Sequence, residues 1–175
     1  MNSSATIQPC VIFLTGLSGS GKTTLANKLT DVLKEKGITP VLLDGDEIRN
    51  IFQVTGFDEA SRKKHNLSIG ALAALLENQG HVVIVALIAP YSEVRKQVRE
   101  MCSRFTEVYL SADIKVCIER DTKGLYKKAI AGEIKEFTGI SAPYHVPENP
   151  ELVLDTAVMN ADECTAAIIR KLGSL

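Results

Sequence analysis

The sequence predicts a three-layer α/β/α fold, in which helices cover both faces of a parallel sheet of about five strands. Short apolar segments alternate with amphipathic helical segments along the 175 residues. The apolar segments are hydrophobic at successive positions, which is typical of parallel strands buried on both faces. The chain has 45% hydrophobic and 23% charged residues, as in an ordinary globular protein. We therefore expect a single domain spanning residues 1–175.

The first half of the chain contains three predicted strands and two predicted helices. Residues 10–15 are an apolar β segment that stops at a glycine-rich loop, and residues 23–36 carry apolar side chains at the helical period. Residues 41–43 are a second buried strand, residues 61–78 a second helix and residues 81–86 a third strand. This alternation predicts parallel strands joined by helical crossovers.

The second half continues the alternation with one interruption. Residues 121–150 are polar, rich in Lys, Gly and Pro, and lack an apolar run of strand length. Such a stretch inside a compact domain is typical of a disordered segment or a functional lid, and we expect a lid. Before this stretch we predict a helix at residues 92–102, a strand at residues 105–110 and a short helix at residues 113–120. After it we predict a strand at residues 151–154 and a helix at residues 161–172.

Composition argues against several classes of protein. The formal net charge is −1, from 20 basic and 21 acidic residues, whereas a broad nucleic-acid interface needs a basic excess. The four cysteines form no C-x-x-C pair, which argues against a zinc or redox site and indicates buried thiols in a reducing compartment. Residues 1–9 lack the pattern of a signal peptide, and the apolar run at residues 82–90 is too short to span a bilayer. We expect a cytoplasmic protein that binds neither nucleic acid nor membrane.

The glycine-rich loop matches the P-loop pattern G-x-x-x-x-G-K-[ST] in full, and it lies between a strand and a helix as this motif requires. Backbone N–H groups of such a loop, together with the helix N-terminus, bind phosphate oxygens. Lys22 would bind the β and γ phosphates of ATP, and the Thr23 hydroxyl would bind Mg²⁺. The predicted ATP-binding residues in and next to the loop are Gly16, Leu17, Ser18, Gly19, Ser20, Gly21, Lys22, Thr23 and Thr24.

Two carboxylates follow the second predicted strand. GTPases and motor ATPases usually carry a carboxylate after the third strand, which is absent here, whereas Asp44 and Asp46 lie one residue apart after the second. This pair suits Mg²⁺ positioning together with a general base for an acceptor hydroxyl. The alternative is an acidic turn with Gly45 at its bend. The position favours a kinase.

Over residues 11–156 the sequence resembles the adenylylsulfate kinase family, which transfers a phosphoryl group from ATP to the 3′-hydroxyl of adenylyl sulfate. The resemblance implies this reaction with Mg-ATP, a homodimer and a role in sulfate activation. The lid carries its most specific part. The matching segments are the P-loop, Leu43-Asp-Gly-Asp46 with Arg49, Gly56-Phe57, Glu119-Arg-Asp-Thr-Lys-Gly-Leu-Tyr-Lys-Lys-Ala129, Gly132-Glu-Ile-Lys135, Phe137-Thr-Gly-Ile140, Pro143-Tyr144 and Pro150-Glu151.

The resemblance implies a catalytic role for residues at the P-loop, after the second strand and in the lid. Asp46 would orient or deprotonate the acceptor hydroxyl, and Asp44 would lie close to Mg²⁺ with Thr23. Lys123 and Arg120 would approach the transferring phosphoryl group and the ATP. The alternative for Lys123 is a solvated lysine on a polar helix face. The predicted catalytic residues are Asp46, Lys22, Asp44 and Lys123.

The resemblance also implies an acceptor site. Arg49 and Arg62 would bind the anionic end of the acceptor, since Arg forks match paired anionic oxygens. Phe57 and Phe137 would stack on the two faces of its base. The alternatives are solvated arginines and ordinary core aromatics. The predicted acceptor-binding residues are Asp46, Arg49, Phe57, Arg62, His65, Ile88, Ala89, Lys123, Phe137, Thr138, Gly139 and Ile140.

The sequence departs from the family pattern at the acceptor's anionic end, while the ATP side is unchanged. Ala89 replaces a common Ser, His65 an Asn, Leu67 and Ser68 two Arg residues, and Glu47 an Asn. Losing a hydrogen bond to a charged group costs about 1.5–3 kcal/mol, enough to change acceptor preference. One alternative is therefore a kinase acting on the 3′-hydroxyl of another 5′-diphosphate-type nucleotide, such as a cytidine diphosphoramidate. The other is a nucleotide-binding protein without catalysis.

Overall fold

The strands of the computed structural model, which describes residues 7–53, 55–121 and 123–173, form one parallel sheet with the order β2-β3-β1-β4-β5. The central strand β1 pairs with β3 on one side and with β4 on the other. This sheet confirms the predicted fold class. The strands are β1 (Cys10–Thr15), β2 (Val41–Asp44), β3 (Val82–Ala86), β4 (Phe105–Ser111) and β5 (Leu152–Asp155).

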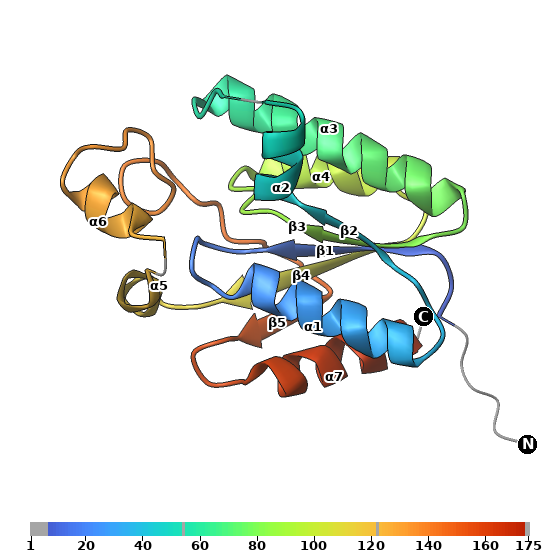
Figure 1. Ribbon diagram of the computed structural model, residues 1–175. Helices are drawn as coiled ribbons and strands as arrows, with labels where there is room; N and C mark the ends of the chain where they lie inside the picture. Colours follow the sequence, from blue (N-terminus) through green and yellow to red (C-terminus); the bar gives the residue numbers. More distant parts are fainter. Residues whose placement is uncertain (1–6, 54, 122, 174–175) are drawn as a thin grey trace, which may run out of the picture.

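Helices cover both faces of the sheet, with α1 and α7 on one face and α3 and α4 on the other (Figure 1). The shorter helices α5 and α6 lie beyond the carboxyl end of the sheet (Figure 1). The helices are α1 (Lys22–Glu35), α2 (Gly45–Ile51), α3 (Glu59–Asn78), α4 (Ser92–Met101), α5 (Ile114–Arg120), α6 (Leu125–Ile130) and α7 (Ala161–Gly173). Within the ranges described, none of these helices has the length and apolarity needed to cross a membrane.

Strand β1 shows how the sequence produces the two cores. All six of its residues are buried. Because side chains alternate across a strand, Ile12 and Leu14 join the cluster under α1 and α7, whereas Val11 and Phe13 join the cluster under α3 and α4. Burying one such side chain stabilises the fold by about 1.5–3 kcal/mol, so the apolar strand fixes the sheet between its helices.

The parallel arrangement places the carboxyl ends of the strands at one edge of the sheet, facing α5 and α6 (Figure 1). The P-loop follows β1, Asp44 closes β2 and residues 87–90 follow β3. In open α/β sheets, ligands bind outside the carboxyl ends of the strands. The fold therefore brings the predicted site segments together.

Two short helices were not predicted. Helix α2 begins directly after β2 because the Asp44 carboxylate caps it, accepting a hydrogen bond from the Asp46 backbone N–H at 2.9 Å. Helix α6 lies inside the predicted lid, where Tyr126 and Ala129 are buried although the surrounding sequence is polar. Both helices are only two turns or less, too short to show a clear period, and local capping or tertiary packing stabilises them.

Candidate active site

A cavity of about 1150 Å³ lies at the carboxyl edge of the sheet, between the P-loop, α2, the segment after β3 and the predicted lid, residues 121–150. It brings together residues that lie more than a hundred positions apart in the chain. The predicted site residues that line it are Ser18, Gly19, Ser20, Gly21, Lys22, Thr23, Thr24, Asp44, Asp46, Arg49, Phe57, Arg62, His65, Ile88, Ala89, Arg120, Lys123, Phe137 and Thr138.

The P-loop wraps around the ammonium group of Lys22. Gly16 has φ 156°, and a Cβ there would lie 2.6 Å from the carbonyl oxygen of Leu110, so this turn requires glycine. The Lys22 ammonium donates hydrogen bonds to the carbonyl oxygens of Gly16 at 2.9 Å and Leu17 at 2.7 Å. Burial lowers the pKa of Lys22 to about 8, with the nearby carboxylates of Asp46 and Asp44 opposing this shift. The loop carbonyl oxygens therefore fix the position of the Lys22 ammonium group.

Two side chains with oxygen atoms that could bind a metal ion meet at the end of this loop, Thr23 and Asp44. The Thr23 hydroxyl donates a hydrogen bond to the Asp44 carboxylate at 2.9 Å. Mg²⁺ is usually bound by one or two protein oxygens plus substrate phosphates and water, and this pair fits that donor set. Among the residues with described positions, no group of three or more His, Cys, Asp or Glu side chains could hold a metal ion. A cation at Thr23 and Asp44 would thus need the phosphates of a bound nucleotide to complete its shell.

An ion pair connects α2 with the lid. The Lys123 ammonium lies 2.6 Å from the Asp46 carboxylate, and the two side chains are 61% and 72% exposed. The hydrogen bond to Asp46 raises the pKa of Lys123. Exposed pairs of this kind contribute little stability, so substrate groups can displace the contact at small cost.

The predicted acceptor residues form a second group. The Arg49 guanidinium donates to the Gly56 carbonyl oxygen at 2.7 Å and lies 4.6 Å from the centre of the Phe57 ring. Arg62 donates to the Thr138 hydroxyl at 3.0 Å and also to the carbonyl oxygen of Glu136. These contacts hold both arginines at the cavity and connect α3 to the lid.

The two aromatic residues predicted to stack on the acceptor base come from different parts of the chain: Phe57 precedes α3, and Phe137 lies within the predicted lid. Phe57 is 58% exposed, so it is no core residue. Phe137 belongs to the lid, and its ring meets that of Tyr126 edge-on with centroids 5.0 Å apart. Both rings line the same cavity, as clamping a base would require.

Two of the residues that depart from the family pattern, His65 and Ala89, also line this cavity. The His65 Nε2 atom lies 3.2 Å from the Gly45 carbonyl oxygen, and burial lowers the pKa of His65. Because a carbonyl can only accept, Nε2 carries the proton, and the Nδ1 atom of the neutral ring is an acceptor. Ala89 is buried and has φ 43°, an uncommon conformation for a residue other than glycine.

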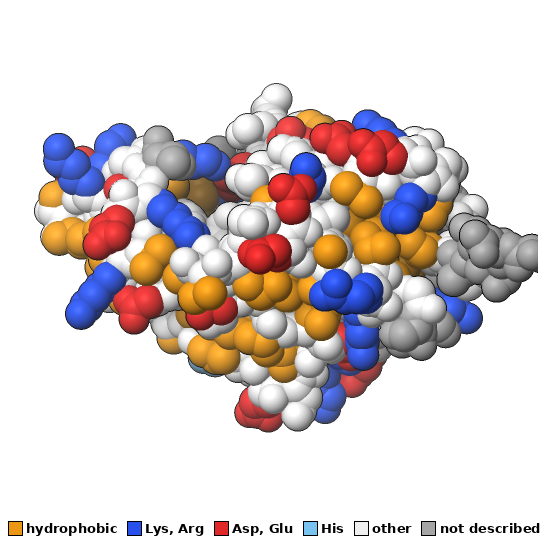
Figure 2. Space-filling model, turned by 90° about the horizontal axis from the view of Figure 1, so that it is seen from below, with side chains coloured by type: hydrophobic (Ala, Val, Ile, Leu, Met, Phe, Trp, Pro, Cys, Tyr) orange, Lys and Arg blue, Asp and Glu red, His pale blue; other side chains and the backbone are white. Residues whose placement is uncertain are grey.

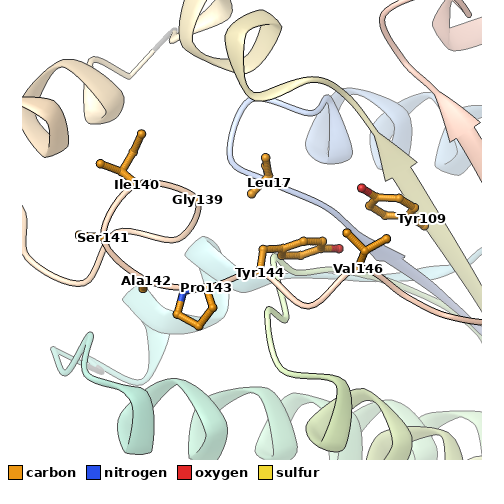
Figure 3. A pocket seen from close by; sticks show the side chains of 9 residues that line it. All are labelled: Leu17, Tyr109, Gly139, Ile140, Ser141, Ala142, Pro143, Tyr144 and Val146. Carbon is orange, nitrogen blue, oxygen red and sulfur yellow. The ribbon is translucent and has the colours of Figure 1, made fainter.

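Four predicted site residues do not line this cavity. Leu17, Gly139 and Ile140 line a second, shallower cavity of about 480 Å³, beside the paired rings of Tyr109 and Tyr144 (Figure 3). Gly16 contributes its carbonyl to Lys22 but lines neither cavity. The binding roles of these residues stay predictions.

Sequence reasoning assigned no site role to Thr156 or Tyr126, which hold carbonyl oxygens of the P-loop and also line the cavity. The Thr156 hydroxyl donates to the Ser20 carbonyl oxygen at 2.9 Å, and Arg120 donates to the Thr156 carbonyl oxygen at 2.5 Å. The Tyr126 hydroxyl donates to the Ser18 carbonyl oxygen at 2.8 Å. Thr156 directly follows the carboxyl end of β5, and this position could have indicated that it belongs to the site.

Comparison with known proteins decides the family. The family model described as Adenylylsulphate kinase matches residues 8–155. The chain belongs to this family. Two curated adenylyl-sulfate kinases illustrate the similarity: that of Prochlorococcus marinus is 45% identical over 93% of this chain and 82% of its own length, and that of Bacillus velezensis is 46% identical over 91% and 82%.

Solved structures agree with this adenylylsulfate kinase assignment. The Mycobacterium tuberculosis APS kinase CysC, in complex with AMPPNP and APS, superposes with a TM-score of 0.90 at 38% identity, covering 95% of this chain and 99% of that one. Shikimate kinase from Aquifex aeolicus, at 17% identity and a TM-score of 0.58 over 94% and 96% of the two chains, shares the fold alone. The resemblance found in the sequence is confirmed.

Proposed function

We propose that this member of the adenylylsulfate kinase family transfers the γ-phosphoryl group of ATP to the 3′-hydroxyl of adenylyl sulfate, which gives 3′-phosphoadenylyl sulfate and ADP. The observation that carries the proposal is one cavity in which the P-loop with Lys22 faces Asp46, Arg49 and Arg62. Relatives at 45–46% identity are adenylyl-sulfate kinases, and a related structure contains APS together with AMPPNP. A donor site and an acceptor site thus share one space.

The P-loop side is suited to hold the triphosphate. Its backbone N–H groups and the N-terminus of α1 attract phosphate oxygens, and Lys22 adds a full positive charge. Thr23 and Asp44 would hold Mg²⁺, which neutralises charge on the β and γ phosphates when it is bound. On ATP binding, the Lys22 ammonium exchanges its loop carbonyls for phosphate oxygens.

The acceptor side supplies the nucleophile. The ribose 3′-oxygen attacks the γ-phosphorus in line, the bond to the β–γ bridging oxygen breaks, and ADP leaves. Asp46 orients the hydroxyl and accepts its proton. Arg49 and Arg62 bind the anionic end of adenylyl sulfate, while Phe57 and Phe137 stack on its base at roughly 1–3 kcal/mol per face.

The lid completes the site. Lys123 and Arg120 approach the transferring phosphoryl group when the lid closes, and closure excludes water that would compete as acceptor. The exposed pair between Lys123 and Asp46 opens as the substrate hydroxyl takes its place at the carboxylate.

A second candidate acceptor is another nucleotide with a 5′-diphosphate-type group. The observation that favours it is the placement of His65 and Ala89 on the cavity surface, where they change the hydrogen-bonding groups at the anionic end. Leu67 packs against the core under α3 and α4, and it offers no cation to either acceptor. Loss of catalysis is disfavoured, because Lys22, Thr23, Asp44 and Asp46 are present and line the site.

An acceptor panel tests the proposal. The purified protein is incubated with Mg-ATP and either adenylyl sulfate, AMP, ADP or a cytidine diphosphoramidate, and ADP release is followed. We expect turnover with micromolar adenylyl sulfate only. Turnover of another nucleotide without adenylyl sulfate would move the assignment to the second candidate, and ATP binding without any turnover would favour a protein without catalysis.

The proposed assembly is a cytoplasmic homodimer. A related structure from Thiobacillus denitrificans is a hexameric APS kinase, with 31% identity over 99% of this chain and 30% of that one, so self-association occurs among relatives. All four cysteines are free, which a reducing compartment maintains. Light scattering coupled to gel filtration is expected to give twice the chain mass of 19.0 kDa; a mass of one chain would contradict the dimer.

A further inference from the structure

Residues 87–90, which follow β3 and which we call the acceptor loop, form one wall of the cavity. The carbonyl oxygens of Ile88, Ala89 and Pro90 accept hydrogen bonds from groups outside the loop. The Thr15 hydroxyl donates to Ile88 at 2.6 Å, Arg95 donates to Ala89 at 2.7 Å, and the His145 backbone N–H donates to Pro90 at 2.8 Å. Ala89 is in the left-handed region, with φ 43°, so its conformation depends on such contacts.

Arg95 is the most connected of these donors. Its side chain is only 3% exposed and makes hydrogen bonds to three separate segments. Beyond the bond to Ala89, its Nε atom donates to Glu107 on β4 at 2.9 Å, and its second terminal nitrogen donates to the His145 carbonyl oxygen at 2.6 Å. Glu107 balances the buried charge and also accepts from Arg99 at 3.1 Å. The planar fork of arginine reaches all three acceptors at once, each from a different nitrogen.

The lid leaves the cavity at Tyr144 and His145, and this pair, the lid root, is fixed to the acceptor loop. The His145 backbone contacts the loop twice, once directly through Pro90 and once through Arg95. The Tyr144 hydroxyl lies 2.9 Å from the Thr15 hydroxyl, which itself holds Ile88. At its amino-terminal start, the lid meets the cavity through the exposed Lys123–Asp46 pair.

We propose that Arg95 is a positioning residue that locks the acceptor loop to the lid root, so that the lid moves only before Tyr144 and the acceptor wall stays fixed. This rests on the proposed function for its kinetic consequence, because the loop is assigned to adenylyl sulfate. Arg95 lies outside the residues that line the cavity and acts through Ala89 and His145. Its loss should therefore affect acceptor binding and leave ATP binding unchanged.

The kinetic test uses Arg95→Lys, which keeps the charge opposite Glu107 and removes the fork. We expect the KM for adenylyl sulfate to rise about tenfold, as for loss of one charge-assisted hydrogen bond, while the KM for ATP stays within about twofold. Unchanged values for both substrates, or equal rises in both, would overturn the proposal.

Glu77→Gln is the matched control. Glu77 is equally buried, at 4% exposure, and accepts hydrogen bonds from the backbone N–H groups of Ser103 at 2.9 Å and Arg104 at 2.5 Å. It lies at the amino end of the sheet and does not line the cavity. This variant is expected to lower the melting temperature with both KM values unchanged. A rise in the acceptor KM here would show that any buried defect has this effect and would overturn the role of Arg95.

Hydrogen exchange on the unmodified protein tests the lock independently of turnover and of variant folding. In the free protein, the His145 amide is expected to have a protection factor at least about tenfold above the amides of α6. When AMPPNP and adenylyl sulfate are added, the α6 amides should gain protection and the His145 amide should not. Equal exchange at His145 and α6 would overturn the proposal. A wild-type protein that does not phosphorylate adenylyl sulfate would instead contradict the proposed function, and the exchange result would still decide whether the root is fixed.

Discussion

At the scale of single residues, Lys22 and Asp46, which we propose bind the phosphates and the acceptor hydroxyl, lie in different environments. Lys22 is surrounded by loop carbonyls, whereas Asp46 reaches into solvent and pairs with Lys123. The difference in environment matches the two roles, because a phosphate-binding cation must be preorganised and a base must exchange partners quickly.

Asp46→Asn tests the proposed base. The amide keeps the shape of the side chain but cannot accept the proton, so kcat is expected to fall about 10²–10⁴-fold. AMPPNP affinity, measured by calorimetry, should stay within about twofold. Turnover near the wild-type rate would remove Asp46 from the mechanism.

Phe57→Ala tests the exposed ring at the acceptor side. Loss of one stacking face, roughly 1–3 kcal/mol, is expected to raise the KM for adenylyl sulfate about tenfold to a hundredfold. The melting temperature should change little, since the ring is mostly exposed. Wild-type kinetics would show that the base binds elsewhere.

The pKa of Lys22 predicts a pH dependence. Burial lowers this pKa from 10.5 to about 8, so the ammonium of the free protein is lost as the pH rises through that value. AMPPNP affinity is therefore expected to fall between pH 7 and 9.5. The sign for stability is opposite: the unfolded chain binds more protons in this window, so the free energy of unfolding from Lys22 increases with pH.

Lys22→Gln provides the control for this dependence, because it has no ammonium to lose. Its AMPPNP affinity is expected to be weaker at pH 7 and to lack the decline above pH 8. A decline of the same size in both proteins would assign the titration to another group.

At the scale of elements, close packing of α3 on α4 positions the acceptor side. A Cβ added to Gly70 of α3 would overlap the side chain of Val98 in α4, which is fully buried. Gly70→Ala is thus expected to destabilise the protein by about 1–3 kcal/mol, as overpacked cores do, which chemical denaturation would measure. An unchanged or higher free energy of unfolding would show that the helices can separate without cost.

The elements also show what the sequence could and could not predict. Strands such as β1 and β3 were evident because burial on both faces leaves a continuous apolar run. Helix α2 was missed because its start depends on the Asp44 cap, and α6 because one buried tyrosine holds a polar segment in place. The support of Ser20 by Thr156 joins residues at the two ends of the chain, which local patterns do not record.

At the scale of the whole molecule, charge agrees with a small anionic ligand. On the face seen in Figure 2, basic and acidic side chains are interspersed. The cations with assigned roles instead converge on one cavity at the carboxyl edge, where Lys22, Arg49, Arg62, Arg120 and Lys123 meet. The motif residues of this cavity were predicted from the sequence, whereas the positions of Gly139 and Ile140 beside the second cavity depend on how the lid folds.

The position of the transferred phosphate is the most direct measurement of the central claim. Adenylyl sulfate is incubated with the protein and ATP labelled in the γ-phosphate, and the product is treated with a 3′-nucleotidase. Label should appear on the nucleotide and be released completely by that enzyme. Label that stays in ATP, or reaches only inorganic phosphate, would contradict phosphoryl transfer to the ribose.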